Sequence, residues 1–234
     1  MGQSPFLLGR VVCLGLYEMF SNHSDINKMI DTINEMNKGV LTGCHGRYHA
    51  MFVVRTVEYI LQSLSYDARM VEMGKIAALL HDIGNIAGRN SHARKGAALA
   101  SVFLDDAGRL SPEERDIIVH AIRDHSEGKS ISSAVGAALL IADKVHVSKE
   151  RLLPTKNVDD WHKNLLEVEN VDLQISDKSI IINYITTEAF CKDLLMDGYE
   201  KGFYLPIKAA EFLGCSCHFQ FNGVNCEKVL TLCV

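Results

Sequence analysis

The sequence predicts a mainly α-helical fold, a bundle over residues ~20–153, followed by a small α+β module over residues 154–234. Before Pro154, apolar residues recur every three or four positions, which is the pattern of helices that bury one face. After Pro154, short runs rich in Val and Ile alternate with turn residues, which is the pattern of strands. We therefore expect two units, residues 1–153 and 154–234, joined by a short linker and packed together.

Five helices are expected after the N-terminal segment. In the first, Val54, Val57 and Leu61 share one apolar face. The second ends at Gly84, a residue suited to a left-handed cap. The fourth opens with Ser-Pro-Glu-Glu at 111–114, a capping box with proline at the first helical position. The expected spans are 47–65, 68–82, 92–106, one that begins after Ser111, and 131–149.

The C-terminal module is expected to hold about four strands. Two β-rich runs flank the Asp-Lys pair at 177–178, which favours a hairpin, and the Asn-Gly pair at 222–223 favours a second one. Thr187 is expected to cap one helix and Gly214 to end another.

Composition narrows the class of protein. The net charge of −5 and the pI near 6.0 argue against a nucleic-acid-binding surface. The apolar N-terminal stretch is interrupted by Arg10 and Glu18, so we expect an amphipathic helix there and no membrane span. Seven cysteines, an odd count, favour reduced thiols and the cytoplasm. Whether the chain forms a homo-oligomer stays open.

A cluster of Cys215, Cys217, His218 and Cys226 in the module allows two interpretations. It could bind zinc, but cysteines in strands are usually small buried apolar residues, and this spacing matches no known zinc motif. We favour a reduced sheet core.

Polar residues that can bind metals stand where apolar helices end. In the stretch KIAALLHDIGN, residues 75–85, His81 and Asp82 directly follow an apolar run, and Asp143 follows AALLIA. A buried carboxylate or imidazole costs several kcal/mol unless a partner compensates it. One divalent ion would compensate both helix ends. His49, His92 and His125 are further candidate ligands.

The order of His49, His81-Asp82 and Asp143, at spacings of 32 and 61 residues, resembles the HD superfamily of metal-dependent phosphohydrolases. The segments LLHDIGN, HARKGAALASVFL, AIRDHSE and LIADK strengthen the resemblance, which covers residues 45–151. It implies the HD-domain helical bundle, in which His49, His81, Asp82 and Asp143 hold a first ion.

The resemblance also implies a second ion, and hence a binuclear centre, held by Asp82 as a bridge with His92 and His125. Asn85 stands where many members have Lys, and Ser126 follows His125 where the cyclic-di-nucleotide branch has a second His. Hydrolysis of cyclic di-GMP is therefore not expected. Imidazole and carboxylate ligands suit Mn, Fe, Mg, Co or Zn, and the sequence does not choose among them.

The implied activity is hydrolysis of a phosphoester or phosphoanhydride in a small, nucleotide-like substrate by a metal-activated hydroxide. Asp82 would act at the centre of the site, and Lys144, Arg94 and Lys95 would contact the phosphate. Two alternatives remain open, a di-iron oxygenase of the HD-like fold and a non-catalytic nucleotide-binding sensor. His120 is expected in the core or behind the ligands, and His45 is either a substrate contact or exposed.

Overall fold

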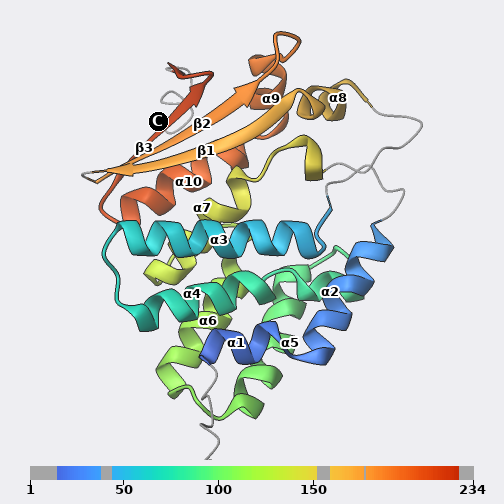
Figure 1. The fold of residues 1–234 in the computed structure, drawn as a ribbon, viewed down its shortest axis with the longest axis vertical. Helices are drawn as coiled ribbons and strands as arrows, with labels where there is room; N and C mark the ends of the chain where they lie inside the picture. The colour runs from blue at the N-terminus through green and yellow to red at the C-terminus, as the bar shows by residue number, and fades with distance from the viewer. Residues whose placement is uncertain (1–14, 38–43, 152–158, 177, 227–234) are drawn as a thin grey trace, which may run out of the picture.

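The computed structural model describes residues 15–37, 44–151, 159–176 and 178–226. The helices before residue 152 form an elongated bundle, and a small sheet with its own helices lies at one end (Figure 1). The predicted fold class, a helical bundle with a C-terminal α+β part, is confirmed. The predicted linker near 152–158 and the N-terminal stretch before Gly15 lie outside the described residues.

The elements have the following bounds. The bundle contains α1 (Leu16–Ser21), α2 (Ser24–Met36), α3 (Arg47–Ser63), α4 (Ala68–Leu80), α5 (His92–Ala107), α6 (Pro112–Asp124) and α7 (Ala134–Val145), with the 3-10 turns η1 (Ile83–Ala87) and η2 (Lys149–Arg151). The C-terminal part contains α8 (Asp160–Leu166), β1 (Val168–Ser176), β2 (Ser179–Thr186), α9 (Lys192–Gly198), α10 (Lys201–Phe212), β3 (Ser216–Phe221) and β4 (Val224–Asn225).

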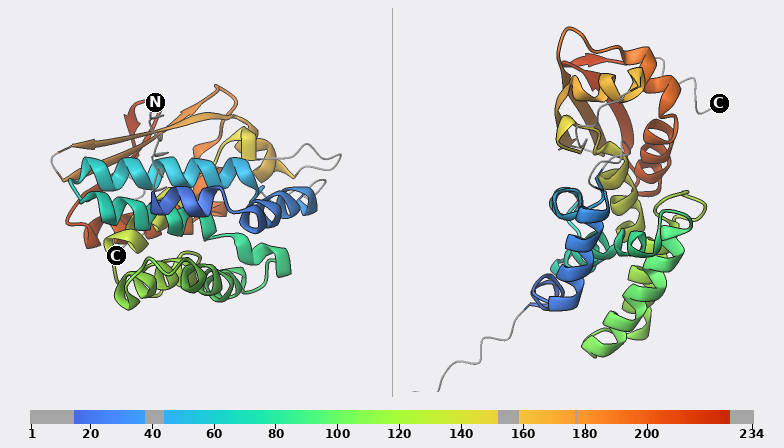
Figure 2. Two further views of the ribbon diagram at one scale, coloured as in Figure 1. Left: turned by 60° about the horizontal axis from the view of Figure 1, so that its bottom comes forward. Right: turned by 90° about the vertical axis from the view of Figure 1, so that its right-hand side faces the viewer.

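The central element is α7. Its sequence is apolar almost all round, and its residues are buried except Gly136. Such a helix must be surrounded, and α7 packs against α3, α4 and α6 within the bundle and against α10 of the C-terminal part. Figure 2 shows α7 reaching from the bundle toward the orange and red end of the chain. The buried C-terminal end of α7 therefore places Asp143 inside the protein.

The sheet has the order β1-β2-β3-β4. β1 and β2 pair antiparallel, as do β3 and β4, so both predicted hairpins are present. Asn222 and Gly223 have φ of 50° and 79°, as the tight turn before β4 requires. β2 and β3 are parallel, which requires a crossover, and α9 and α10 provide it.

One face of the sheet packs on α10. Tyr184 of β2 and Phe219 of β3 are buried there, and Phe203 of α10 meets Phe219 edge to face with 5.0 Å between ring centroids. Cys217 lies on the same buried face, whereas His218 is exposed on the other. The buried reduced cysteines agree with the sheet-core interpretation.

The expected role of Gly84 is wrong. α4 ends at Leu80, and Gly84 lies inside η1 without a positive φ. A Cβ on Gly84 would lie 2.0 Å from the carbonyl oxygen of His92 and 2.4 Å from the amide nitrogen of Gly96. Glycine is therefore needed because η1 touches the backbone of α5. The capping box of Ser111 and Glu114, in contrast, is confirmed.

The expected helix cap at Thr187 is also wrong. The next helix, α9, begins at Lys192 with Cys191 as its N-cap. Thr187 instead donates its hydroxyl to the Glu167 carboxylate and its backbone N–H to the Glu167 carbonyl. Thr187 therefore joins the end of β2 to the start of β1. No helix among the described residues combines the length and the apolar character that a membrane crossing requires.

Candidate metal centre

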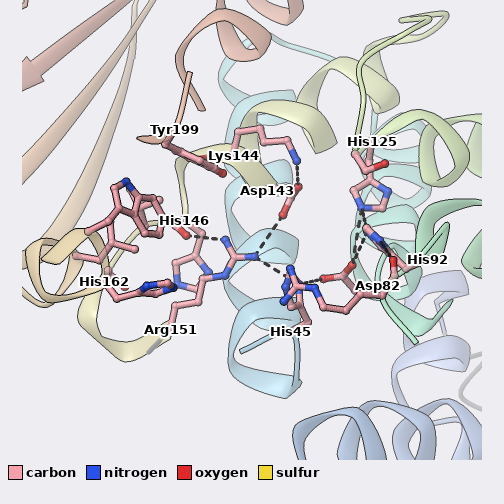
Figure 3. Close-up of a pocket in the computed structure, with 16 residues that line it drawn as sticks. His45, Asp82, His92, His125, Asp143, Lys144, His146, Arg151, His162 and Tyr199 are labelled. Carbon is pink, nitrogen blue, oxygen red and sulfur yellow. Dashed lines mark hydrogen bonds and ion pairs between the residues drawn. The ribbon is translucent and has the colours of Figure 1, made fainter. Parts of the chain in front are cut away.

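The six residues expected as metal ligands come from five different elements and lie together. They are His49 on α3, His81 and Asp82 just after α4, His92 at the start of α5, His125 just after α6, and Asp143 on α7. Five of them are buried, and His92 is partly buried. Figure 3 shows His92, His125, Asp82 and Asp143 facing one cavity. Helix ends that are far apart in the sequence thus meet at one point.

One group of ligand atoms surrounds the first candidate position. The Nε2 atom of His49 lies 3.1 Å from Nε2 of His81 and 3.2 Å from Oδ1 of Asp143. The Oδ2 atom of Asp82 lies 3.4 Å from Nε2 of His49 and 3.2 Å from Nε2 of His81. Two imidazole nitrogens and two carboxylate oxygens therefore converge.

A second group lies on the other side of Asp82. The Oδ1 atom of Asp82 lies 3.5 Å from Nε2 of His92 and 3.8 Å from Nε2 of His125. Those two nitrogens are 3.3 Å apart. The two oxygens of Asp82 therefore face different sets of nitrogens. This is the arrangement that a carboxylate needs to bridge two ions.

The hydrogen bonds of three histidines fix which nitrogen carries the proton. Each donates its Nδ1–H to the carbonyl three residues earlier, which in the neutral imidazole leaves Nε2 with a free lone pair. The pairs are His81 with Ala78 (2.7 Å), His125 with Ile122 (2.6 Å) and His92 with Arg89 (3.0 Å). The bare Nε2 atoms of His92 and His125 would repel each other at 3.3 Å. A cation between such lone pairs removes this repulsion, so the donor set fits a metal.

The ionisation of the buried carboxylates also favours a cation at this site. Burial alone would raise the pKa of Asp82, but neighbouring histidines, His81 first, hold the pKa of Asp82 well below its ordinary value. Burial likewise opposes ionisation of Asp143, yet Lys144 and the histidines hold the pKa of Asp143 low. Two buried negative charges therefore require positive charge beside them.

The histidines differ in their charge. Burial disfavours the charged form of His81, but Asp82 and Asp143 outweigh it and raise the pKa of His81. Burial lowers the pKa of His125 to about 3, so His125 is neutral at pH 7. Burial also lowers the pKa of His49. Lys144 supplies positive charge to Asp143, and at Asp82 the positive charge comes either from protonated His81 or from a divalent cation.

A cavity of about 330 Å³ opens beside the ligands. Lys144 and Arg151 bring cationic groups to it, and Trp161, Leu165 and Tyr199 of the C-terminal part form another wall. The Nζ atom of Lys144 lies 2.6 Å from Oδ2 of Asp143. The cavity therefore combines candidate ligands, positive charge and an aromatic wall.

Three cavity residues were missed or only weakly indicated by the sequence. His45 precedes α3, and its Nδ1 is 2.7 Å from Oδ2 of Asp82. Arg151 donates to the carbonyl of His146 (2.8 Å) and lies 4.0 Å from Asp143. His45 lies in an irregular segment and Arg151 in the short 3-10 turn η2, where no periodicity in the sequence reveals the direction of a side chain.

His146 is the third. Its Nδ1 lies 2.8 Å from Nδ1 of His49, and its ring stacks on Phe52 with 3.8 Å between centroids. If Nε2 of His49 faces a metal, Nδ1 of His49 carries the proton and His146 accepts it. The sequence feature that could have indicated His146 is its position three residues after the candidate ligand Asp143.

The remaining predicted residues lie outside the cavity. Lys95 donates its Nζ to the carbonyl of Ala87 at 2.7 Å. Arg94 lines an adjoining groove together with His92. His120 is partly buried on α6 and does not line the cavity. The structure therefore brings Lys144 to the candidate ligands but not Lys95.

The HD-domain family model matches residues 47–178, more than half of the chain. The chain belongs to the HD-domain family. The resemblance seen in the sequence is thus confirmed, and the HD domain contains all six candidate ligands.

Two known proteins are similar to this HD-domain chain. Ribonuclease Y of Mycoplasma mycoides is 27% identical over 157 residues, which cover 66% of this chain and 34% of the relative. The chain thus spans about a third of the length of that relative. The crystal structure of a predicted HD superfamily hydrolase from an uncultured Thermotogales bacterium is 23% identical, with a TM-score of 0.44, and the match covers 58% of this chain and 75% of that one.

Proposed function

We propose that this HD domain is a metal-dependent phosphohydrolase that cleaves a phosphoester or phosphoanhydride in a small, nucleotide-like substrate. The observation that carries the proposal is the convergence of bare imidazole nitrogens on Asp82 and Asp143 beside a cavity that contains Lys144 and Arg151. Membership of the HD-domain family supports it, and a relative named as a ribonuclease is in keeping with phosphoester chemistry.

In this proposal the candidate ligands act as two sets that share Asp82. The first set is His49, His81, Asp82 and Asp143, and the second set is Asp82, His92 and His125. Divalent cations bound there would polarise a phosphoryl oxygen and lower the pKa of a coordinated water toward neutrality.

Lys144 and Arg151 would hold the substrate phosphate. Phosphoryl transfer gathers negative charge on the phosphate oxygens, and fixed cations in a partly enclosed site stabilise it. Lys144 is buried, and its backbone carbonyl accepts a hydrogen bond from the Tyr199 hydroxyl at 3.3 Å, which ties α7 to the C-terminal part. The guanidinium of Arg151 presents a planar set of donors that suits phosphate oxygens. Trp161 and Leu165 would exclude water from the far side.

His45 would position Asp82. Its Nδ1 is 2.7 Å from Asp82 and 3.5 Å from Nη2 of Arg151. The shorter contact places the proton on Nδ1, so His45 donates to Oδ2 of Asp82. This hydrogen bond holds the orientation of the carboxylate, and such support of a ligand typically changes metal affinity or activity by about 10–100-fold.

The test is to purify the protein, count its metal by mass spectrometry, and assay p-nitrophenyl phosphate and a panel of nucleotides with each of Mn, Fe, Mg, Co and Zn. Asp82→Asn should lose both metal and activity, because an amide cannot bridge two cations as a carboxylate does. Asp160→Asn is the control, since that carboxylate is exposed on α8. Full activity of metal-free protein would contradict the proposal.

Two other experimental outcomes would favour an alternative function over the phosphohydrolase. Oxygen consumption with a mixed-valent iron signal, without phosphate release, would indicate the di-iron oxygenase. Nucleotide binding by calorimetry with no turnover under any metal would indicate a sensor.

A further inference from the structure

A second hollow adjoins the cavity of the candidate metal centre. It has a volume of about 480 Å³, and three of its lining residues, Arg89, His92 and Ser126, also line the first cavity. In Figure 3, His92 and His125 lie at one end of the first cavity, and His162 and Tyr199 lie toward the other. The second hollow, which we call the basic groove, therefore continues from the His92 end of the site.

The basic groove carries an excess of positive charge. Five cationic side chains line it, namely Arg89, Arg94, Arg123, Lys129 and Lys201. Two carboxylates, those of Asp124 and Glu127, line it as well. The whole chain, in contrast, has a net charge of −5. The charge of the groove is thus positive, whereas the charge of the whole chain is negative.

Internal ion pairs account for only part of this charge. Arg123 binds Asp124 through two hydrogen bonds of 3.0 and 2.7 Å, and Lys129 pairs with Glu127. Arg89, Arg94 and Lys201 have no side-chain hydrogen bond within the described part of the chain, although Arg94 and Lys201 contribute to the low pKa of Glu127. Three cationic groups therefore remain available to an anion.

The backbone favours an anion at the same place. Ser91, His92 and Ala93, at the N-terminus of α5, line the groove. The side chain of Ser91 makes no capping hydrogen bond to the helix. The amide groups and the dipole of the 16-residue α5 thus add to the field of the side chains.

We infer that the basic groove binds a second phosphate group of the substrate while a first phosphate lies at the metal centre. The inference rests on the proposed function and narrows it, because it excludes simple phosphomonoesters as the main substrate. The substrate class is a compound with at least two phosphates, and a nucleoside polyphosphate and a short oligonucleotide share this chemistry. Lys201 on α10 gives the C-terminal part a share in the selection.

Direct binding is tested first, without any reaction. Isothermal titration of the full chain, freed of metal with a chelator, compares tripolyphosphate with inorganic phosphate. Tripolyphosphate should bind more tightly, and the double variant Arg94→Gln/Lys201→Gln should weaken it roughly tenfold, because charge-assisted hydrogen bonds are lost. The control variant Lys28→Gln/Arg55→Gln changes the net charge equally on exposed faces of α2 and α3, and it should bind like the original protein.

Kinetics then test the link to the metal centre. With metal restored, the KM of Arg94→Gln/Lys201→Gln for ATP and for a 5′-phosphorylated trinucleotide is compared with its KM for p-nitrophenyl phosphate. The KM of at least one multi-phosphate compound should rise roughly tenfold more than that of the single-phosphate ester. Which of the two responds distinguishes a nucleoside polyphosphate from an oligonucleotide.

The outcomes separate this inference from the proposed function. If no phosphate compound is hydrolysed with any metal but tripolyphosphate binding depends on Arg94 and Lys201, the proposed function fails and the anion site stands. If tripolyphosphate binds no better than phosphate, or if the control variant loses as much affinity as the groove variant, the inference is overturned. Equal changes of KM for all substrates would also overturn it.

Discussion

Replacing Gly84 with alanine tests how η1 positions the candidate second ion. The new Cβ would lie 2.0 Å from the His92 carbonyl oxygen, whereas ordinary contact begins at 3.4 Å, so the start of α5 must retreat by about 1.4 Å. Overpacking of this kind costs about 1–3 kcal/mol. The obstacle here is backbone on both sides, so we expect about 3 kcal/mol, the upper end of that range.

Two measurements follow from this displacement. In a domain of this size, about 3 kcal/mol lowers the Tm by roughly 6–12 °C in calorimetry. Because His92 moves with its backbone, and ligands must be placed within about 0.5 Å, the second of the two proposed ions should be lost and the metal content should fall toward one ion per chain. The first ligand set, which includes His49 and Asp143, should keep its ion.

Gly136→Ala is the matched control. A Cβ on Gly136 of α7 has its nearest neighbour, Oγ of Ser133, at 3.5 Å, which is ordinary contact. Since alanine favours helices over glycine by about 1 kcal/mol, this variant should be unchanged or slightly more stable. If Gly84→Ala matched Gly136→Ala in both Tm and metal content, the reasoning about the η1–α5 contact would be refuted.

Three further predictions concern single contacts. His146→Leu should weaken metal affinity about 10–100-fold in a chelator competition, because Nδ1 of His49 loses its hydrogen-bond acceptor. His146→Asn keeps an acceptor and should retain most of the metal affinity. Equal losses in the two variants would show that His146 only fills space. The hydrogen bond from Arg69 lowers the pKa of Glu114 to about 2, below its ordinary 4.5, so the stabilisation is complete above pH 4.5 and is lost as the pH falls toward 2. The original protein should therefore exceed Glu114→Gln in unfolding free energy by about 0.5–1 kcal/mol at pH 7 and by nothing near pH 2, and a constant difference across pH would contradict the ion pair. The hydroxyl of Tyr184 is buried without a hydrogen-bond partner among the described residues, so Tyr184→Phe should raise the stability by about 1 kcal/mol in urea unfolding, and a loss would reveal a partner.

Features that depend on local sequence could be predicted. The apolar face of α3 and the capping box of α6 follow from residues a few positions apart, and so does the turn at Asn222. Asp143 stood out because it follows a run of apolar side chains, which indicates that its carboxylate lies close to the core. The sequence therefore predicted the helices α3 to α7, the two hairpins and the polar groups at the ends of α4 and α7.

Features that depend on distant contacts could not be predicted. Thr187 is equally suited to a helix cap or a loop, and Glu167, which lies 20 residues away, decides between them. Gly84 follows a helix, as a capping glycine does, but the approach of α5 is its real requirement. Arg151 lies in a short 3-10 turn, so its side-chain direction depends on the tertiary packing.

The wall of the cavity that contains Trp161, Leu165 and Tyr199 has a consequence for the growing chain. During synthesis, every candidate metal ligand, from His49 to Asp143, leaves the ribosome before any residue of that wall. Under the proposed function, the residues that would hold the metals are therefore synthesised before the residues that would confine the substrate. A nascent chain that has emerged as far as Asp143 thus has all six candidate ligands but none of the side chains of this wall.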